Sequence, residues 1–130
     1  MNLLYMLKDE PGIIDIKGFT LEPNSIVLEY AEYGDLSKYL KNQKTELTLS
    51  EKTTIGEQIA LAINSLHSFQ PKIAHRDLKS LNVLVTSLNP LVVKVSDFET
   101  ACFIPNFFVS GKSVIDNPIW MAPELILGTK

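Results

Sequence analysis

The 130-residue sequence has only one cysteine, Cys102, and only one arginine, Arg76. A single cysteine cannot form a disulfide within the chain, so we expect a reducing compartment and a cytoplasmic location. The lysines are spread along the chain and the formal net charge is −3, which argues against electrostatic binding to nucleic acid. No apolar run approaches the roughly 18 residues of a membrane span, so we expect none.

What the sequence does contain is the composition of one globular domain. Hydrophobic residues make up 45% of the chain and charged residues 21%, which excludes an intrinsically disordered protein. A chain of this length forms a single domain and no more.

Two pairs of short β-rich runs are separated by turn sequences. Residues 13–19 and 26–30 flank Glu22-Pro23-Asn24-Ser25 and read as an antiparallel pair. Residues 82–85 and 91–95 flank a second proline-containing turn and form a hairpin-like pair. The stretch from Asp97 to Asn117 lacks periodicity, and we expect a long loop, which is unusual in a compact domain unless it is functional.

Helical signals occur in three places. The first seven residues read as the end of an amphipathic helix, and Asp35 is suited to the first turn of a short helix that follows it. Thr48 and Glu51 have the spacing of a capping box and precede the longest periodic segment. We expect a helix from about Ser50 to Ser68, with an apolar stripe at steps of three and four: Ile55, Ile59, Ala62, Ile63 and Leu66.

The most informative stretch is His75-Arg76-Asp77-Leu78-Lys79-Ser80-Leu81-Asn82. Asp97-Phe98 follows Asn82 by fifteen residues, and Trp120-Met121-Ala122-Pro123-Glu124 comes later. These blocks closely resemble the protein kinase family, whose signature runs H-R-D-L-x-x-x-N, D-F-G and A-P-E. Lys79, two residues after the aspartate, together with the last block, is most similar to the tyrosine-kinase-like group of serine/threonine kinases.

The resemblance implies an α+β fold: an incomplete kinase-like domain with the end of the small lobe and the first half of the mainly helical large lobe. Residues 1–31 correspond to a small-lobe remnant and the hinge. Residues 32–130 correspond to a large-lobe portion with the catalytic loop and the activation segment. The implied activity is phosphoryl transfer from ATP to serine or threonine of a protein substrate.

The resemblance also assigns roles residue by residue. Asp77 would orient the substrate hydroxyl, and Lys79 would place positive charge near the transferred phosphoryl group. Asn82 would act in catalysis and, with Asp97, hold Mg²⁺ through hard oxygen ligands. ATP and Mg²⁺ are therefore the implied cofactors.

Nucleotide contacts are implied nearer the start of the chain. Leu28 matches the gatekeeper position, and the backbone of Glu29 and Ala31 would bind the adenine edge. Asp35 would meet the ribose, or it caps its helix and does no more. Residues implied to pack include Leu84, under the adenine, and a stack that joins the two lobes: Leu4, Ile16, His75 and Phe98.

Several departures from the family pattern leave a second interpretation open. The chain contains no glycine-rich phosphate loop and no V-A-I-K strand. Glu99 replaces the D-F-G glycine, which tolerates backbone conformations that cost other residues about 1–2 kcal/mol. Asp116-Asn117 replaces the usual Gly-Thr. The alternative is a catalytically dead pseudokinase remnant or binding module.

Two further expectations concern partners and regulation. In the family, the stripe from Ile55 to Leu66 normally packs on helices that this sequence does not contain. We therefore expect an uncovered apolar face, which indicates a protein partner, aggregation or a fragment of a longer chain. Arg76 is either part of the scaffold or pairs with a phosphorylated loop residue, for which Ser110 and Ser113 are candidates.

Overall fold

The computed structural model describes residues 3–42, 46–104 and 118–127, and only the backbone of Leu4. Its helices are α1 (Leu3–Met6), α2 (Leu36–Asn42), α3 (Leu49–Ser68) and α4 (Pro123–Ile126), with 3-10 turns η1 (Ser80–Asn82) and η3 (Pro118–Trp120). Its strands are β1 (Ile16–Leu21), β2 (Asn24–Leu28), β3 (Ile73–Ala74), β4 (Val83–Leu88), β5 (Leu91–Val95) and β6 (Cys102–Phe103). The α+β class predicted from the sequence is confirmed.

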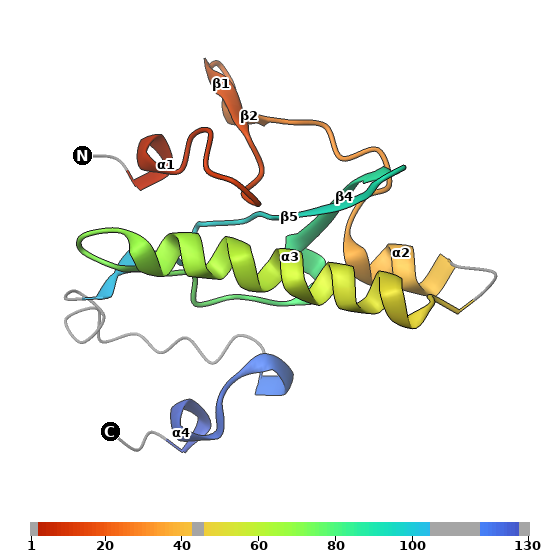
Figure 1. Cartoon of the computed structure of the whole chain (residues 1–130). Helices are drawn as coiled ribbons and strands as arrows, with labels where there is room; N and C mark the ends of the chain where they lie inside the picture. The colour runs from red at the N-terminus through yellow and green to blue at the C-terminus, as the bar shows by residue number, and fades with distance from the viewer. Residues whose placement is uncertain (1–2, 43–45, 105–117, 128–130) are drawn as a thin grey trace.

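The strands of the described ranges pair antiparallel, two by two (Figure 1). β1 pairs with β2 and β4 with β5, as the two proline-containing turns predict. The third pair, β3 with β6, was not predicted. Residues 102–103 fall inside the segment that we expected to be a loop throughout, so that expectation is wrong at this point. Two-residue strands joined over about thirty positions of sequence carry no local periodicity that could reveal them.

The long helix α3 runs the length of the molecule and packs against β5 (Figure 1). Its predicted capping box is present, with the Glu51 N–H donating to Thr48 Oγ1 at 3.2 Å and the Thr48 N–H donating to Glu51 Oε2 at 2.8 Å. This reciprocal pair fixes the start of the helix within a residue of the predicted position.

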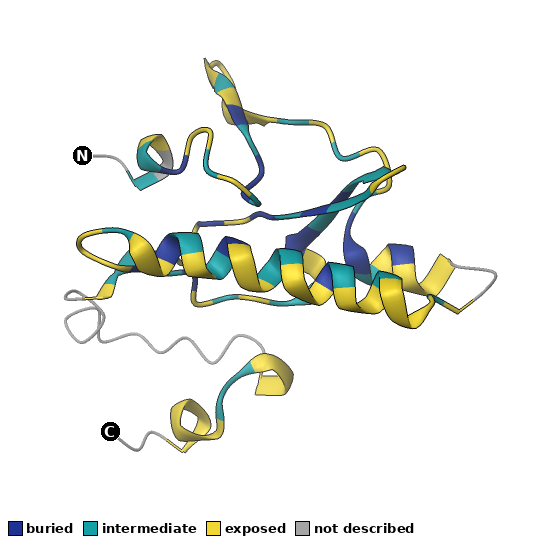
Figure 2. Ribbon diagram, in the orientation of Figure 1, coloured by how far each residue is buried: buried dark blue, intermediate teal, exposed yellow. Residues whose placement is uncertain are grey.

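The apolar stripe of α3 is covered, which corrects the expectation of an open face. The first half of the helix contributes Ile55 to one buried cluster, with Leu36, Tyr39, Val83, Val85 and Val93. The second half contributes Ala62 and Leu66 to another, with Leu7, Ile13, Ile73, Val95 and Phe98. Residues of α2, of the strands and of the segment before β1 cover the stripe that we expected to be open. The opposite face of α3 is exposed (Figure 2).

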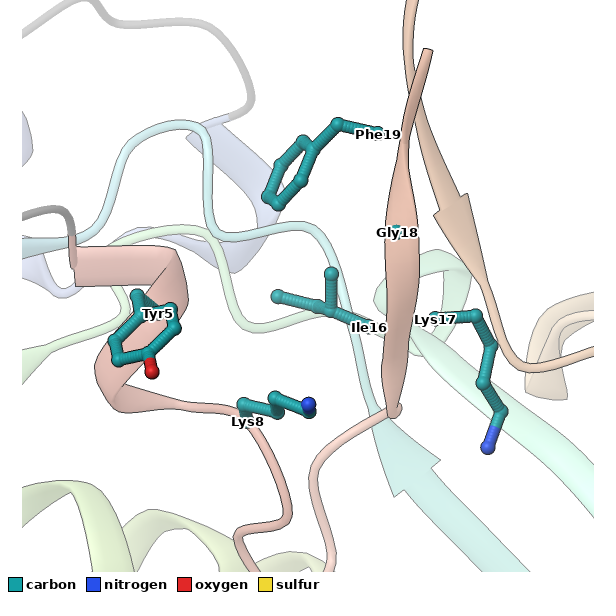
Figure 3. A pocket seen from close by; sticks show the side chains of 6 residues that line it. All are labelled: Tyr5, Lys8, Ile16, Lys17, Gly18 and Phe19. Atoms are coloured by element: carbon teal, nitrogen blue, oxygen red, sulfur yellow. The ribbon is translucent and has the colours of Figure 1, made fainter.

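The β1–β2 hairpin is the most exposed paired element. Phe19 opposes Ile26 in the register, and their exposed fractions are 57% and 46%. Phe19 and Ile16 both face α1, where they line a pocket of about 120 Å³ with Tyr5 and Lys8 (Figure 3). None of the predicted site residues lines this pocket, although Ile16 belongs to the predicted stack between the lobes.

Several predicted features fall beyond what the structure describes. The candidate phosphorylation sites Ser110 and Ser113, the Asp116-Asn117 pair and the side chain of Leu4 lie outside the described residues. Among the helices that are described, none has both the length and the hydropathy needed to cross a membrane.

Candidate active site

The catalytic-loop motif begins directly after β3, and His75 anchors it to the core. The imidazole is 4% exposed and stacks in a tilted arrangement on Phe98, with ring centroids 4.9 Å apart. Its Nε2 lies 2.9 Å from the carbonyl oxygen of Ser96, and the Asp77 N–H donates to its Nδ1 at 3.2 Å. These contacts require a proton on Nε2 and none on Nδ1, which is the neutral ring. Burial lowers the pKa of His75, which favours the same form.

Asp77, Lys79 and Asn82 come together at a single carboxylate. Lys79 Nζ lies 2.5 Å from Asp77 Oδ2, and Asn82 Nδ2 donates to the same oxygen at 2.9 Å. Asn82 Nδ2 also donates to the Asp77 carbonyl at 2.8 Å. The five-residue separation of Asp77 and Asn82 is closed by η1, which turns the chain back on itself. The side chains of Asp77 and Lys79 are partly buried, at 26% and 18% exposure.

The segment that carries Asp97 is bound to Asn82 through the preceding residue, Ser96. Ser96 donates to the Asn82 carbonyl twice, from its backbone N–H at 2.8 Å and from its hydroxyl at 3.1 Å. Phe98, on the other side, is buried against His75. Asp97 itself is exposed. The carboxylates of Asp77 and Asp97 both act to raise the pKa of His75, but burial, which lowers that pKa, outweighs them.

Backbone strain lies at Asp97 and not at Glu99. Asp97 has φ of 63° and Arg76 has φ of 72°, both in the left-handed region that costs a non-glycine residue about 1–2 kcal/mol. Glu99 has no positive φ. The penalty expected for replacing the D-F-G glycine is therefore absent in this conformation, and Glu99 is an exposed residue whose N–H points to Asp97 Oδ1 at 3.4 Å.

The residues at this site fit a magnesium ion bound together with phosphate. Both donor hydrogens of Asn82 Nδ2 are used on Asp77, which leaves its amide oxygen as a ligand, and Asp97 supplies an exposed carboxylate. No group of three or more histidine, cysteine or acidic side chains within the described ranges could hold a metal ion by itself. Mg²⁺ bound through one or two protein oxygens and substrate phosphates needs no such group.

The residues predicted to contact the nucleotide lie along the path from β2 to α2. Leu28 ends β2 and is 41% exposed, Glu29 and Ala31 are half-buried, and Asp35 is buried at 8% exposure. The Val85 N–H donates to the Gly34 carbonyl at 2.8 Å, and Asp35 bridges to Leu84, so this path is bound to β4.

Asp35 makes the contacts of a helix cap. Its Oδ1 accepts from the Lys38 N–H at 2.9 Å, and its Oδ2 lies 3.1 Å from Lys38 Nζ. The backbone hydrogen bond from Lys38, together with that cation, lowers the pKa of the Asp35 carboxyl. The ribose contact stays a prediction beside this observed role.

Three contacting residues were missed by the sequence reasoning. Ser96 ties the Asp97 segment to Asn82, and Thr100 Oγ1 donates to the His75 carbonyl at 3.1 Å. Lys94 forms an ion pair with Glu29. Ser96 and Thr100 flank the Asp97-Phe98 pair, and that adjacency is the signal that could have pointed to them; nothing local connects Lys94 with Glu29.

The fold, the catalytic-loop geometry and the sequence define a protein kinase domain, and the chain belongs to the family of protein tyrosine and serine/threonine kinases, which it matches over residues 1–130. It is 43% identical over 121 residues to the probable serine/threonine-protein kinase roco5 of Dictyostelium discoideum, covering 91% of this chain and 4% of that protein. It is 37% identical over 120 residues to the serine/threonine-protein kinase CTR1 of Arabidopsis thaliana, covering 89% of this chain and 14% of that protein.

The similarity to roco8 of Dictyostelium discoideum is of the same order, at 40% identity over 124 residues, 90% of this chain and 6% of that protein. The chain thus spans no more than a small part of the curated relatives it matches. CTR1 supports the predicted likeness to the tyrosine-kinase-like group. Protein kinases use ATP and Mg²⁺ and act on proteins.

Proposed function

We propose that the protein containing this chain is an ATP-dependent serine/threonine kinase in which Asp77 orients the hydroxyl of the protein substrate. Residues 1–31 supply the end of the small lobe and the hinge, and residues 32–130 supply the large-lobe portion with the catalytic loop and the activation segment. The observation that supports this most directly is the convergence of Lys79 and Asn82 on Asp77 Oδ2.

The local contacts suit each residue to its proposed role. Asp77 accepts a hydrogen bond from the substrate hydroxyl and takes its proton as the oxygen attacks the γ-phosphorus in line and the bond to the leaving ADP oxygen breaks. Asn82 holds Asp77 from two sides, so the carboxylate is fixed before substrate arrives. Lys79 contacts the same oxygen of the Asp77 carboxylate as Asn82 does, and it supplies a cation for the transferred phosphoryl group.

Asn82 and Asp97 would hold Mg²⁺ through an amide and a carboxylate oxygen. Bound there, the ion neutralises charge on the phosphate oxygens. The nucleotide base would lie between Leu84 and the backbone of Glu29 and Ala31, with Leu28 beside it and Asp35 at the ribose. We propose a serine or threonine side chain of a protein as the acceptor.

The test is peptide phosphorylation by the full-length gene product and by its Asp77→Asn variant. Removing the carboxylate should lower kcat by about 10²–10⁴-fold, with a smaller change in KM. The control is Asp9→Asn, the same change at an exposed loop aspartate whose φ of 63° asparagine tolerates. Equal kcat in wild type and Asp77→Asn would reject the role of Asp77.

A non-catalytic binding role is the second candidate, and Glu99 is the observation that favours it. Its exposed carboxyl group follows Asp97 by two residues and brings negative charge to the place where phosphate would bind. In this case Mg-ATP should not raise the melting temperature of the wild type, whereas Glu99→Gly should gain a ligand-dependent shift. Thermal stabilisation of the wild type by Mg-ATP would contradict the second candidate.

A further inference from the structure

The hinge residue Glu29 is tied to the rest of the molecule through both its backbone and its side chain. Its N–H donates to the Asp15 carbonyl at 2.8 Å, and its Oε2 accepts from the Asp15 N–H at 3.3 Å. The same oxygen lies 2.5 Å from Lys94 Nζ on β5. Glu29 therefore contacts two segments that are 14 and 65 residues away in the sequence.

Those two segments are themselves joined, so Glu29 closes a ring of contacts. The Ile14 N–H donates to the Val95 carbonyl at 2.9 Å, and the Val95 N–H donates to the Gly12 carbonyl at 2.8 Å. Ile14 and Val95 are both buried, at 2% and 0% exposure. The segment from Gly12 to Asp15 is thus fixed along β5, and it presents the Asp15 backbone to the hinge from a rigid support.

The Glu29–Lys94 ion pair is partly buried. The two side chains are 26% and 25% exposed, so water screens them less than it does a surface pair. Lys17, in contrast, is 56% exposed and pairs with the Asp15 carboxylate, whose pKa it lowers through their hydrogen bond. Lys17 therefore pairs with Asp15 and Lys94 pairs with Glu29. Of the two lysines, only Lys94 belongs to the large-lobe portion.

We propose that the Glu29 side chain is a positioning residue: with Lys94 and the Asp15 backbone, it fixes the hinge main chain in the geometry that receives the adenine edge. This inference rests on the proposed function, since it names the device that holds the nucleotide subsite of that function in place. It predicts that the charge on Lys94 affects binding of the base and leaves binding of the phosphates unchanged.

The experiment compares two ligands on the full-length gene product by isothermal titration calorimetry: Mg-ATP and Mg-tripolyphosphate, which lacks the base. Lys94→Met keeps the length of the side chain and removes its charge. It should weaken Mg-ATP binding about fivefold and leave Mg-tripolyphosphate binding within about twofold of wild type. Lys94→Arg, which restores a cation, should return the Mg-ATP affinity to near the wild-type value.

Two controls separate the ring of contacts from a general loss of charge. Lys17→Met removes a lysine from the same cluster without touching Glu29, and it should leave both affinities within about twofold of wild type. In a double-mutant cycle, Glu29→Gln combined with Lys94→Met should cost no more than the worse single variant, because the two side chains act through one contact.

The outcomes distinguish this inference from the proposed function. Wild type that binds Mg-ATP together with an unchanged Lys94→Met rejects the positioning role alone. Equal weakening of both ligands in Lys94→Met, or failure of Lys94→Arg to rescue, also rejects it, since both indicate a general structural role. Wild type that binds neither ligand rejects the nucleotide site itself, and the positioning role with it.

Discussion

His75 shows how a single residue in the catalytic loop can serve the site without chemistry of its own. It accepts a hydrogen bond from the Asp77 backbone and lies 2.9 Å from the Ser96 carbonyl, so it connects the segments that carry Asp77 and Asp97. A buried imidazole can do this only while it is neutral, because protonation would put a donor where Nδ1 must accept. Its titration should therefore affect the stability of the fold.

Stability should decrease at mildly acidic pH because of His75. Burial lowers its pKa in the folded state below the ordinary value of 6.5, so the unfolded chain takes up the proton first. The contribution of neutral His75 to the free energy of unfolding therefore has its full value above pH 6.5. It falls as the pH decreases toward the lower pKa of the folded state, by at most about 1.4 kcal/mol per pH unit. Urea titrations at about 6 pH values between pH 7.5 and pH 5 measure this slope.

The variant His75→Gln should lose most of that slope, because no titrating group is left at the position. His67→Gln is the matched control, since His67 lies on the exposed end of α3. Asp35 does not interfere: its pKa is lowered from 3.8, so its contribution to stability is lost only below that pH. An unchanged slope in His75→Gln would assign the titration to another group.

Gly12 lies close against α3. Its φ is +76°, and a Cβ built there would lie 2.9 Å from the Cβ of Ala62. Gly12→Ala should therefore lower the free energy of unfolding by about 2–4 kcal/mol, from the left-handed backbone and the overlap together. The comparison is Gly56→Ala, in an open part of α3 where nothing lies within 4 Å, which should raise stability by about 0.5–1 kcal/mol.

Circular dichroism during urea unfolding measures both alanine variants in the same way. Opposite signs for Gly12→Ala and Gly56→Ala are the expected result. Equal, small effects would mean that the segment before β1 can move away from Ala62, and that the close approach of the two backbones is not required by the fold.

At the scale of the elements, α3 organises the molecule, and its start is fixed by a local device. Thr48→Ala removes the hydroxyl that caps the Glu51 N–H, and it should cost about 1 kcal/mol of stability. Thr53→Ala is the matched control: Thr53 is exposed inside the helix and bonds only back to the Leu49 carbonyl. That change should cost nothing or stabilise slightly, because alanine has the higher helix propensity. Equal losses in both variants would contradict the capping role.

The helix and the two hairpins were predictable because their signals are local. The capping box and the three-to-four spacing from Ile55 to Leu66 lie within the helix, and each hairpin surrounds its own turn. The β3–β6 pair was missed because Ile73 meets Phe103 through tertiary contact alone. The same applies to the segment proposed as the hinge, where no sequence spacing connects Glu29 with Lys94.

The candidate site divides in the same way. The family resemblance identified Asp77, Asn82 and Asp97, and those positions stay predictions in their catalytic roles. Their geometry depends on left-handed backbone at Arg76 and Asp97. Arginine gives no sign of that conformation in a sequence and aspartate gives only a weak one. Buried neighbours such as His75 and Phe98 hold the two residues in it.

At the scale of the whole molecule, the two buried clusters lie one behind the other along α3 and are both built from segments distant in sequence. The catalytic loop joins the two clusters: Ile73, just before the loop, belongs to one cluster, and Val83, just after it, belongs to the other. Packing in either cluster should therefore hold the loop in place as well as the helix.

This arrangement predicts that two leucines of α3 differ greatly in how much they contribute to stability. Leu66 is 0% exposed and belongs to the cluster with Ile73 and Val95, whereas Leu61 is 61% exposed. Leu66→Ala should lower the free energy of unfolding by about 2–5 kcal/mol, and Leu61→Ala should change it by less than about 0.5 kcal/mol. Urea denaturation followed by circular dichroism measures both.

The same pair of variants decides whether α3 needs an external partner. If the clusters described above are the true cover of the stripe, the loss in Leu66→Ala is the same whether or not other proteins are present, because its neighbours belong to this chain. If instead a partner covered the exposed face, Leu61→Ala would be the variant that loses stability when the protein is studied in its complex. A loss at Leu61 and none at Leu66 would contradict the packing of the helix on β3 and β5.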